Sequence, residues 1–380
     1  MRAALLVAAA AVHAAHALSA TAPPPLRPSP LPVGRYATLR GVRVYYLDVS
    51  PPADVPVVAT AVLHHGFASN VDGFSELVPR LVAAGVRVVA MDRPAFGRTQ
   101  RMAAPPLGWR ANLATLGENP YSTAAAVAMT SLLLSRLGVT GPVVGVGHSL
   151  GANIAVRACL ADPGRYAALG LVAPALLPPV PPAVRLEDLA RFNLTAPLAR
   201  LESEARVLSF RALQQAPVAL FREPLLERVR EIAKGDPRAS VATNFHDAAR
   251  VDLAFVAGKY TRPLREAPNW AESLLEFYRA DGPGGLSPQP GEPLVEAAAA
   301  AASRPRRRQF GAENTVARRR VDLVISGDSD ATVPAAAARR VADGLGCPLV
   351  ELEKCGHLPH EEWPQETADL IVELCRMAAV

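Results

Sequence analysis

The feature that most limits the folds open to this chain is a regular alternation of short apolar runs with amphipathic segments. The apolar runs begin soon after Tyr36 and are bounded by Gly, Pro or Asp, as is typical of buried strands. Helical segments separate them, for example Phe74 to Ala83, Ser122 to Leu137 and Leu150 to Leu160. Strands that alternate with helices form a parallel sheet. The expected strands are Val42 to Leu47, Val57 to Leu63, Val86 to Met91, Val143 to Val146, Leu169 to Val172, Val321 to Ile325 and Leu349 to Leu352.

The alternation is interrupted between Pro174 and Val316, where the pattern is helical. We therefore expect an α/β fold whose core, a doubly wound and mostly parallel sheet, consists of residues 36–173 and 317–380. Residues 174–316 are predicted to form an inserted helical cap. Within it, residues 281–309 contain an alanine run and an arginine run, and we expect this low-complexity segment to be disordered.

The N-terminus resembles a targeting segment rather than part of the fold. Residues 1–20 begin with Met1 and Arg2 and continue with an apolar and then a small-residue stretch, the pattern of a cleaved targeting peptide. Residues 21–35 are expected to be a Pro-rich linker. This predicts a plastid or secretory-pathway protein, or a cytoplasmic one if the segment is not functional.

Composition excludes several classes of protein. Half of the 380 residues are apolar and 20% are charged, which argues against disorder, a fibre or a polytopic membrane protein. The net charge is +5, and the basic runs at 306–308 and 318–320 lack interleaved aromatic residues, so no nucleic-acid partner is expected. We expect no stable membrane span in the mature chain. The four cysteines have no metal-ligand spacing, and neither a metal nor another cofactor is predicted.

One pentapeptide carries the strongest chemical signal. Gly147-His148-Ser149-Leu150-Gly151 follows an expected strand and opens an expected helix, which is the context of a nucleophile elbow. The serine occupies a sharp turn, and the two glycines avoid steric clash on either side of it. Ser149 is therefore the predicted nucleophile.

A serine hydroxyl is a weak nucleophile and needs a base that accepts its proton. We assign this role to His357, in the loop between the last expected strand and the last helix. The base in turn needs a carboxylate to fix its tautomer. Asp330 is the predicted acid, and Asp328 in the same turn is the alternative. The order Ser, Asp, His along the chain is one of the known triad orders.

The oxyanion that forms on attack requires two hydrogen-bond donors. The backbone N–H of Leu150 is the first predicted donor. The second is the N–H of Phe67, in the loop after an early strand, where Gly66 allows the backbone to approach a substrate.

Taken together, these motifs make the chain resemble an α/β-hydrolase with a helical cap. The resemblance implies about eight strands and a cap inserted after the sixth. It extends to plant and algal members, many of them predicted to enter plastids. Epoxide hydrolases and haloalkane dehalogenases share the architecture but carry aspartate at the elbow, so Ser149 favours ester-type substrates. The residues that carry the resemblance are His65 to Phe67, Asp92 to Thr99, Asn119 to Ser122, Gly147 to Gly151, Tyr260 to Leu264 with Trp270, Gly327 to Pro334, and Gly356-His357 with Glu362 and Pro364.

The resemblance also bears on the choice of acid. The sixth strand ends at Val172 to Ala175 without a carboxylate, so the alternative acid position of some relatives is empty, which favours Asp330. The expected protein is a serine hydrolase that acts on a small, hydrophobic ester. The alternatives are acyl transfer, thioester, amide or C–C bond cleavage at the same residues, and a ligand receptor without turnover.

Overall fold

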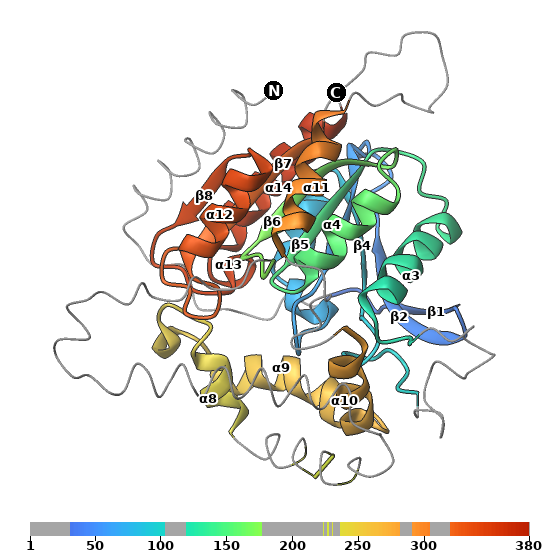
Figure 1. The fold of residues 1–380 in the computed structure, drawn as a ribbon, viewed down its shortest axis with the longest axis vertical. Coiled ribbons are helices and arrows are strands. Elements are labelled where there is room, and N and C mark those ends of the chain that lie inside the picture. Colours follow the sequence, from blue (N-terminus) through green and yellow to red (C-terminus); the bar gives the residue numbers. More distant parts are fainter. Residues whose placement is uncertain are drawn as a thin grey trace, which may run out of the picture.

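The computed structural model describes residues 31–102, 119–176, 223, 226–227, 230, 236–281, 291–304 and 320–379. Its centre is an eight-stranded sheet with the strand order β1-β2-β4-β3-β5-β6-β7-β8 (Figure 1). Neighbouring strands from β4 to β8 are parallel, whereas β2 runs antiparallel to both β1 and β4. The strands are β1 (Arg35–Leu39), β2 (Val42–Val49), β3 (Ala59–His64), β4 (Val86–Met91), β5 (Val143–His148), β6 (Tyr166–Val172), β7 (Val321–Gly327) and β8 (Leu349–Leu352).

This sheet confirms the expected fold class, and each strand expected from an apolar run is present. Every residue of β3, β5 and β7 is buried, as in a parallel sheet that is covered on both faces. Strand β1 was not among the runs found in the sequence. It pairs with β2 through a tight turn in which Arg40 and Gly41 both have positive φ, the geometry of a two-residue hairpin loop.

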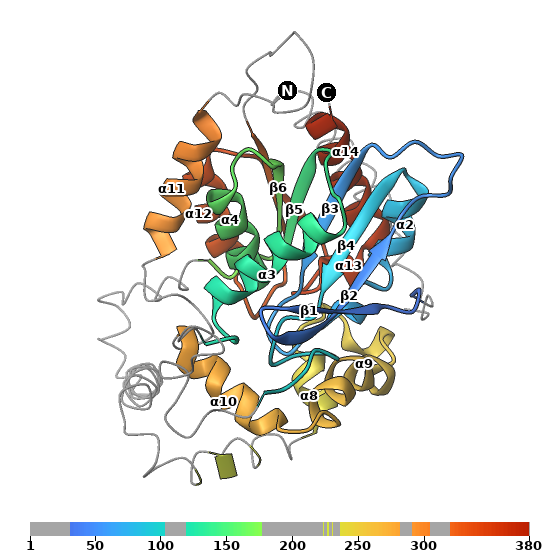
Figure 2. The ribbon, with the colours of Figure 1, turned by 90° about the vertical axis from the view of Figure 1, so that its right-hand side faces the viewer.

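Helices cover the two faces of the sheet unequally (Figure 2). One face is covered by α3 (Thr123–Arg136), α4 (Gly151–Ala161) and α12 (Ala335–Leu345). The other is covered by α2 (Leu77–Ala83) and the last helix, α14 (Pro364–Ala379). Each face buries its own hydrophobic cluster, and this burial is the main stabilising contribution to the fold.

The described part of the insertion between β6 and β7 is helical. It contains α8 (Pro237–Ala242), η4 (Ala248–Arg250), α9 (Leu253–Arg265) and α10 (Trp270–Asp281), which gather beyond one end of the sheet in Figure 1. Helix α9 contacts η1 (Val71–Phe74), the turn that follows β3. These helices therefore lie at the carboxyl ends of the parallel strands, where ligands bind in open α/β sheets. The expected cap residues 177–222 lie outside the described part of the chain.

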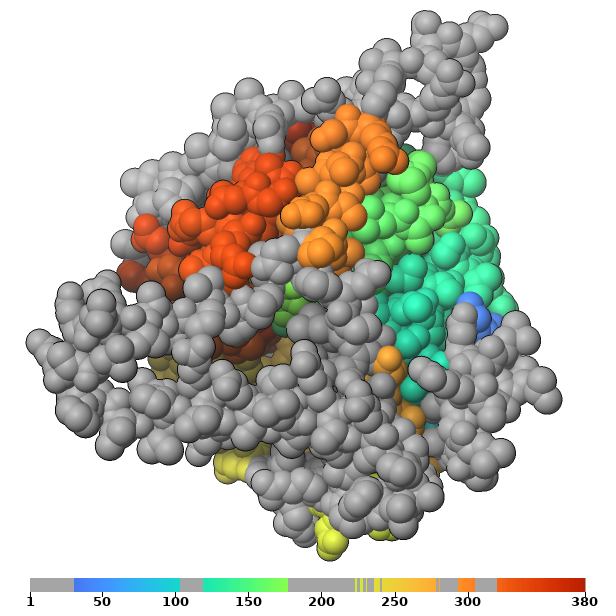
Figure 3. Space-filling model, in the orientation of Figure 1, coloured from blue at the N-terminus to red at the C-terminus, as the bar shows by residue number. Residues whose placement is uncertain are grey.

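The alanine-rich part of segment 281–309 differs from the expectation of disorder. Residues Gly291–Ser303 form α11, which lies against α4 and α12 of the core (Figure 3). Alanine has the highest helix propensity, and Leu294, Val295 and Ala298 are buried against the core. The buried side chain of Arg320 also donates a 2.9 Å hydrogen bond to the carbonyl of Ala298. The alanine run therefore forms an ordered helix, because it has high helix propensity and an apolar face that packs on the core, although its low complexity predicted disorder.

The N-terminal predictions lie mostly beyond the described residues. The expected targeting peptide, residues 1–20, and residues 21–30 of the expected linker are not described. Among the helices that the structure does describe, none has both the length and the apolar character needed to cross a bilayer.

Candidate active site

Ser149 stands on a strained turn between β5 and α4. Its φ is 51°, in the left-handed region that non-glycine residues rarely adopt, and such strain clusters at functional sites. Its backbone N–H donates to the carbonyl of Val172 at 2.9 Å, which fixes the turn against the neighbouring strand. The side chain is largely buried, with 7% of the residue exposed.

The two glycines around Ser149 lie where a larger side chain would clash with neighbouring backbone atoms. A Cβ on Gly147 would lie 2.5 Å from the Cα of Ala152. A Cβ on Gly151 would lie 2.0 Å from the carbonyl oxygen of His64, at the end of β3. Real Cβ atoms essentially never approach backbone atoms this closely. Both glycines therefore allow the start of α4 to pack directly on β5 and β3.

The predicted base and acid are hydrogen bonded to each other. Nδ1 of His357 lies 2.8 Å from Oδ2 of Asp330, whose side chain is fully buried. The other carboxylate oxygen of Asp330 accepts the backbone N–H groups of Thr332 and Val333, both at 2.8 Å. Because a carboxylate can only accept here, the proton is on Nδ1 of His357. Its Nε2 is therefore the atom that is able to accept a proton from another group.

Asp328, the alternative acid, makes its hydrogen bonds to Ser329 and Cys355. Its Oδ1 accepts the hydroxyl of Ser329 at 2.7 Å and the backbone N–H of Cys355 at 3.3 Å. These are local bonds that close the turn after β7 and hold it against the loop after β8. Between the two aspartates, the hydrogen-bond geometry places Asp330 at His357.

The loop that carries His357 lies directly against the nucleophile turn. Nε2 of His148, the residue before Ser149, donates to the carbonyl of His357 at 2.9 Å. The two imidazole rings are also in contact, with centroids 4.9 Å apart. Burial lowers the pKa of His148 well below its ordinary value, so this imidazole is neutral. The structure therefore brings the segments of Ser149, His357 and Asp330 together.

The two segments predicted to donate to an oxyanion also flank Ser149. A Cβ on Gly66 would lie 3.0 Å from the Cβ of Ser149, so the loop that contains Phe67 abuts the nucleophile. Leu150, the other predicted donor, is the N-cap of α4. The free N–H groups at the start of a helix carry partial positive charge and stabilise a nearby negative charge.

Next to this loop the structure presents an apolar wall. The ring of Phe67 packs edge-on against Phe96, with centroids 5.6 Å apart, and in a tilted arrangement against Phe277 of α10, with centroids 6.0 Å apart. Phe67 is nevertheless 42% exposed, an unusual value for a packed aromatic residue. Leu150 belongs to the same hydrophobic cluster as Phe96 and Phe277. An apolar group bound near Ser149 would find aromatic surface there.

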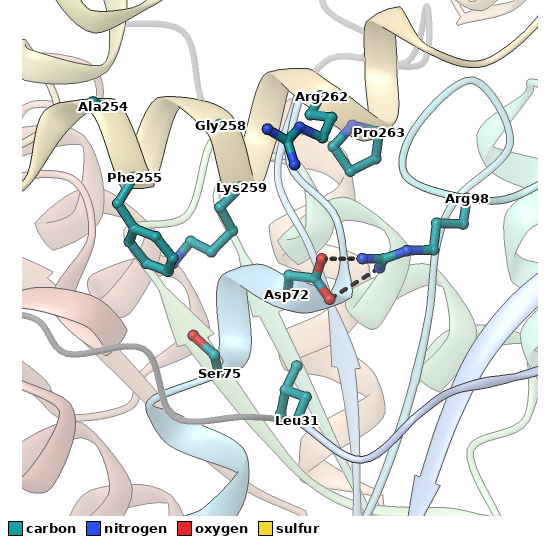
Figure 4. A pocket seen from close by; sticks show the side chains of 10 residues that line it. All are labelled: Leu31, Asp72, Ser75, Arg98, Ala254, Phe255, Gly258, Lys259, Arg262 and Pro263. Carbon is teal, nitrogen blue, oxygen red and sulfur yellow. Dashed lines mark hydrogen bonds and ion pairs between the residues drawn. The ribbon is translucent and has the colours of Figure 1, made fainter.

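A separate cleft of about 370 Å³ lies between η1 and α9 (Figure 4). None of Ser149, Asp330 and His357 lines it. Three of its charged side chains are already held in ion pairs within the protein: Arg98 with Asp72 at 2.7 Å, and Lys259 with the buried Glu361 at 2.9 Å. We therefore do not assign this cleft to the candidate active site.

The sequence did not predict the residues of the insertion between β6 and β7 that contact the site. The backbone N–H of His357 donates to the carbonyl of Asn244 at 2.7 Å, and the side-chain oxygen of Asn244 accepts the hydroxyl of Thr332 at 3.0 Å. Asn244 thus links the loop of the base to the loop of the acid. No motif marks it, because one of these two bonds uses its backbone.

Over the residues that the structure describes, no group of three or more His, Cys, Asp and Glu side chains is arranged to hold a metal ion.

A sequence profile described as the alpha/beta hydrolase family matches residues 61–370. The chain therefore belongs to the alpha/beta hydrolase family. The match begins within β3 and ends within α14, so it spans the sheet from β3 to β8 together with the insertion.

Three individual proteins illustrate the similarity. The chain is 31% identical over 143 residues to a monoacylglycerol lipase from Mycolicibacterium smegmatis, covering 37% of this chain and 46% of the lipase. It is 30% identical over 149 residues to a non-heme chloroperoxidase from Streptomyces lividans, covering 39% and 46%. Each match thus spans less than half of the relative. The solved esterase from Thermogutta terrifontis has a TM-score of 0.59 and 18% identity, covering 91% of this chain and 99% of the esterase, which is a likeness of fold.

Proposed function

We propose that this protein is a serine hydrolase that cleaves an ester-type bond of a small, hydrophobic substrate through an acyl-enzyme on Ser149. The observation that carries the proposal is the 2.8 Å hydrogen bond between His357 Nδ1 and Asp330 Oδ2, beside a strained serine turn. This bond fixes the Nδ1 proton of His357 toward Asp330, so that in the neutral imidazole Nε2 is the nitrogen that can accept a proton. A neutral imidazole with a fixed tautomer is what a serine hydroxyl needs to become a nucleophile.

In the proposed reaction, Ser149 Oγ attacks the ester carbonyl while His357 accepts its proton. The backbone N–H groups of Leu150 and Phe67 stabilise the negative charge that develops on the carbonyl oxygen. His357 then protonates the leaving alcohol, and Asp330 stabilises the charged imidazole without taking the proton. Water, activated by His357, hydrolyses the acyl-enzyme and regenerates Ser149.

Two observations support a hydrophobic ester as substrate. The exposed ring of Phe67 and the cluster of Phe96, Phe277 and Leu150 present apolar surface beside the nucleophile turn. Burying apolar area stabilises a complex by about 25 cal/mol per Å² of surface. In addition, the relative from Mycolicibacterium smegmatis is named a monoacylglycerol lipase, and a glyceride is an ester with an apolar acyl chain.

Turnover of p-nitrophenyl esters by the Ser149→Ala variant tests the proposal. We expect kcat/KM to fall by at least about 10³-fold relative to the unaltered chain, because attack requires the hydroxyl. The variant should remain folded, since alanine removes only one oxygen. Undiminished turnover by folded Ser149→Ala protein would exclude Ser149 as the nucleophile.

Ester hydrolysis also has to be separated from the other reactions open to the same residues. Acyl transfer is recognised by the product formed when an alcohol competes with water for the acyl group. Thioester, amide and C–C substrates of matched acyl chain, assayed side by side, rank the bond that is cleaved. Faster turnover of any of these than of the ester would replace the ester in the proposal.

A further inference from the structure

The carboxylate of Glu362 contacts the backbone of the loop that carries His357. Its Oε1 accepts the N–H of Gly356, the residue before His357, at 2.7 Å. Glu362 ends the short helix α13 (Pro359–Glu362), only five residues after the proposed base. The side chain therefore folds back on the loop that carries His357.

The second carboxylate oxygen of Glu362 contacts the cap. Oε2 accepts the backbone N–H of His246 at 2.8 Å. The same cap segment receives the N–H of His357 through the carbonyl of Asn244. A Cβ on Gly356 would lie 2.5 Å from that carbonyl oxygen, so the cap segment and the base loop are in direct backbone contact. The carboxylate of Glu362 thus joins cap segment 244–246 to the loop that carries His357.

We propose that Glu362 is a positioning residue, which holds His357 at Ser149 and ties the loop of the base to cap segment 244–246. This inference rests on the proposed function. A neutral glutamine cannot replace the carboxylate, because one of its two terminal atoms is an N–H donor and would face a backbone N–H. The loop would then lose at least one of these bonds, and a shift of about 1 Å in a catalytic group can cost about 100-fold in rate.

The kinetic test is the Glu362→Gln change in two backgrounds, the unaltered chain and His357→Ala. If Glu362 acts through His357, kcat/KM for a p-nitrophenyl ester falls by about 10- to 100-fold in the first background. In the second it changes by less than about threefold, because residues that act as a unit are not additive. Glu366→Gln, the same chemical change in the first turn of α14, is the control and should leave kcat/KM unchanged. An equal loss in both backgrounds, or no loss in either, would overturn the proposal.

Hydrogen–deuterium exchange of the full chain tests the link to the cap and does not depend on activity. Glu362→Gln should speed exchange in peptides covering both 244–246 and 356–358, whereas Glu366→Gln should not. Faster exchange in the base loop alone would refute the link to the cap. If Glu362→Gln does not fold, Glu362→Asp retains the charge with a shorter reach, and we expect smaller changes in the same two peptides. Should Ser149→Ala retain ester turnover, the proposed function fails, while the exchange result still decides whether Glu362 joins the two segments.

Discussion

Asp330 and His357 are 27 residues apart in the sequence, yet the carboxylate Oδ2 and the imidazole Nδ1 lie 2.8 Å from each other. The contact exists because β7 and β8 are neighbouring parallel strands, so the loops that follow them meet at the same edge of the sheet. The other oxygen of Asp330 is held by two backbone N–H groups, and the carboxylate cannot turn away without losing them.

The first prediction separates the two aspartates of this turn. Asp330→Asn should lower kcat for an ester by about 10²- to 10⁴-fold, because the amide would not fix the proton on Nδ1 of His357. Asp328→Asn, the matched control, should lower kcat by less than about tenfold, since Asp328 makes only loop contacts. A larger loss from Asp328→Asn than from Asp330→Asn would assign the acid to Asp328.

The second prediction concerns the close contact of α4 with β3. Gly151→Ala should destabilise the protein by about 1–3 kcal/mol or more, because the new methyl group would overlap the carbonyl of His64. Gly141→Ala, whose Cβ would meet nothing within 4 Å, should change the free energy of unfolding by less than about 0.5 kcal/mol. Denaturant titration of both variants measures the difference. Equal stabilities would show that the start of α4 is not packed as described.

The third prediction concerns the buried ion pair that joins α9 to α13. Lys259 is 7% exposed and Glu361 is fully buried, so removing the Glu361 carboxylate leaves the Lys259 ammonium buried without its ion-pair partner. Glu361→Gln alone should cost about 3–5 kcal/mol of unfolding free energy. Combined with Lys259→Met, it should cost clearly less than the sum of the single changes. Additive losses in a double-mutant cycle would contradict a direct interaction.

The fourth prediction is a pH dependence. Burial lowers the pKa of His360 from 6.5 to about 3, so between these values the unfolded chain binds a proton that the folded chain does not. The stability linked to this group is therefore fully present above pH 6.5 and is lost as the pH falls toward 3. His360→Gln should reduce the slope of the unfolding free energy against pH in this window, by up to about 1.4 kcal/mol per pH unit.

Chemical unfolding at pH 6.5, 5.5 and 4.5 measures this slope. The comparison uses slopes, so a constant loss of stability in the variant does not affect it. An unchanged slope would show that His360 takes up a proton in the folded protein as readily as in the unfolded chain.

Much of the fold was predictable because its signals are local. The apolar runs indicated the strands of the parallel sheet, and the elbow sequence indicated a sharp turn between a strand and a helix. Strand β1 was missed because it is short and lies at the edge, where two of its five residues are buried. Helix α11 was missed because its alanine run looks like low complexity, and its order depends on burial against α4 and α12.

The candidate site was less predictable wherever its contacts join distant segments. The sequence offered Asp328 and Asp330 in one turn, and only the arrangement of the loops shows which carboxylate reaches His357. Asn244 acts partly through its backbone carbonyl, which any residue possesses. Glu362 belongs to a motif that the sequence shows, yet its contact with the insertion between β6 and β7 depends on tertiary structure.

The most direct test of the central claim is the reaction of the folded chain with a fluorophosphonate, followed by peptide mass spectrometry. This reagent labels a serine only when the hydroxyl is activated, and it requires no particular acyl substrate. We expect one phosphonate per chain, on the peptide that contains Ser149, and a much slower reaction in the His357→Ala variant. A folded chain that stays unlabelled, or that carries the label on another residue, would contradict the proposal that Ser149 is an activated nucleophile.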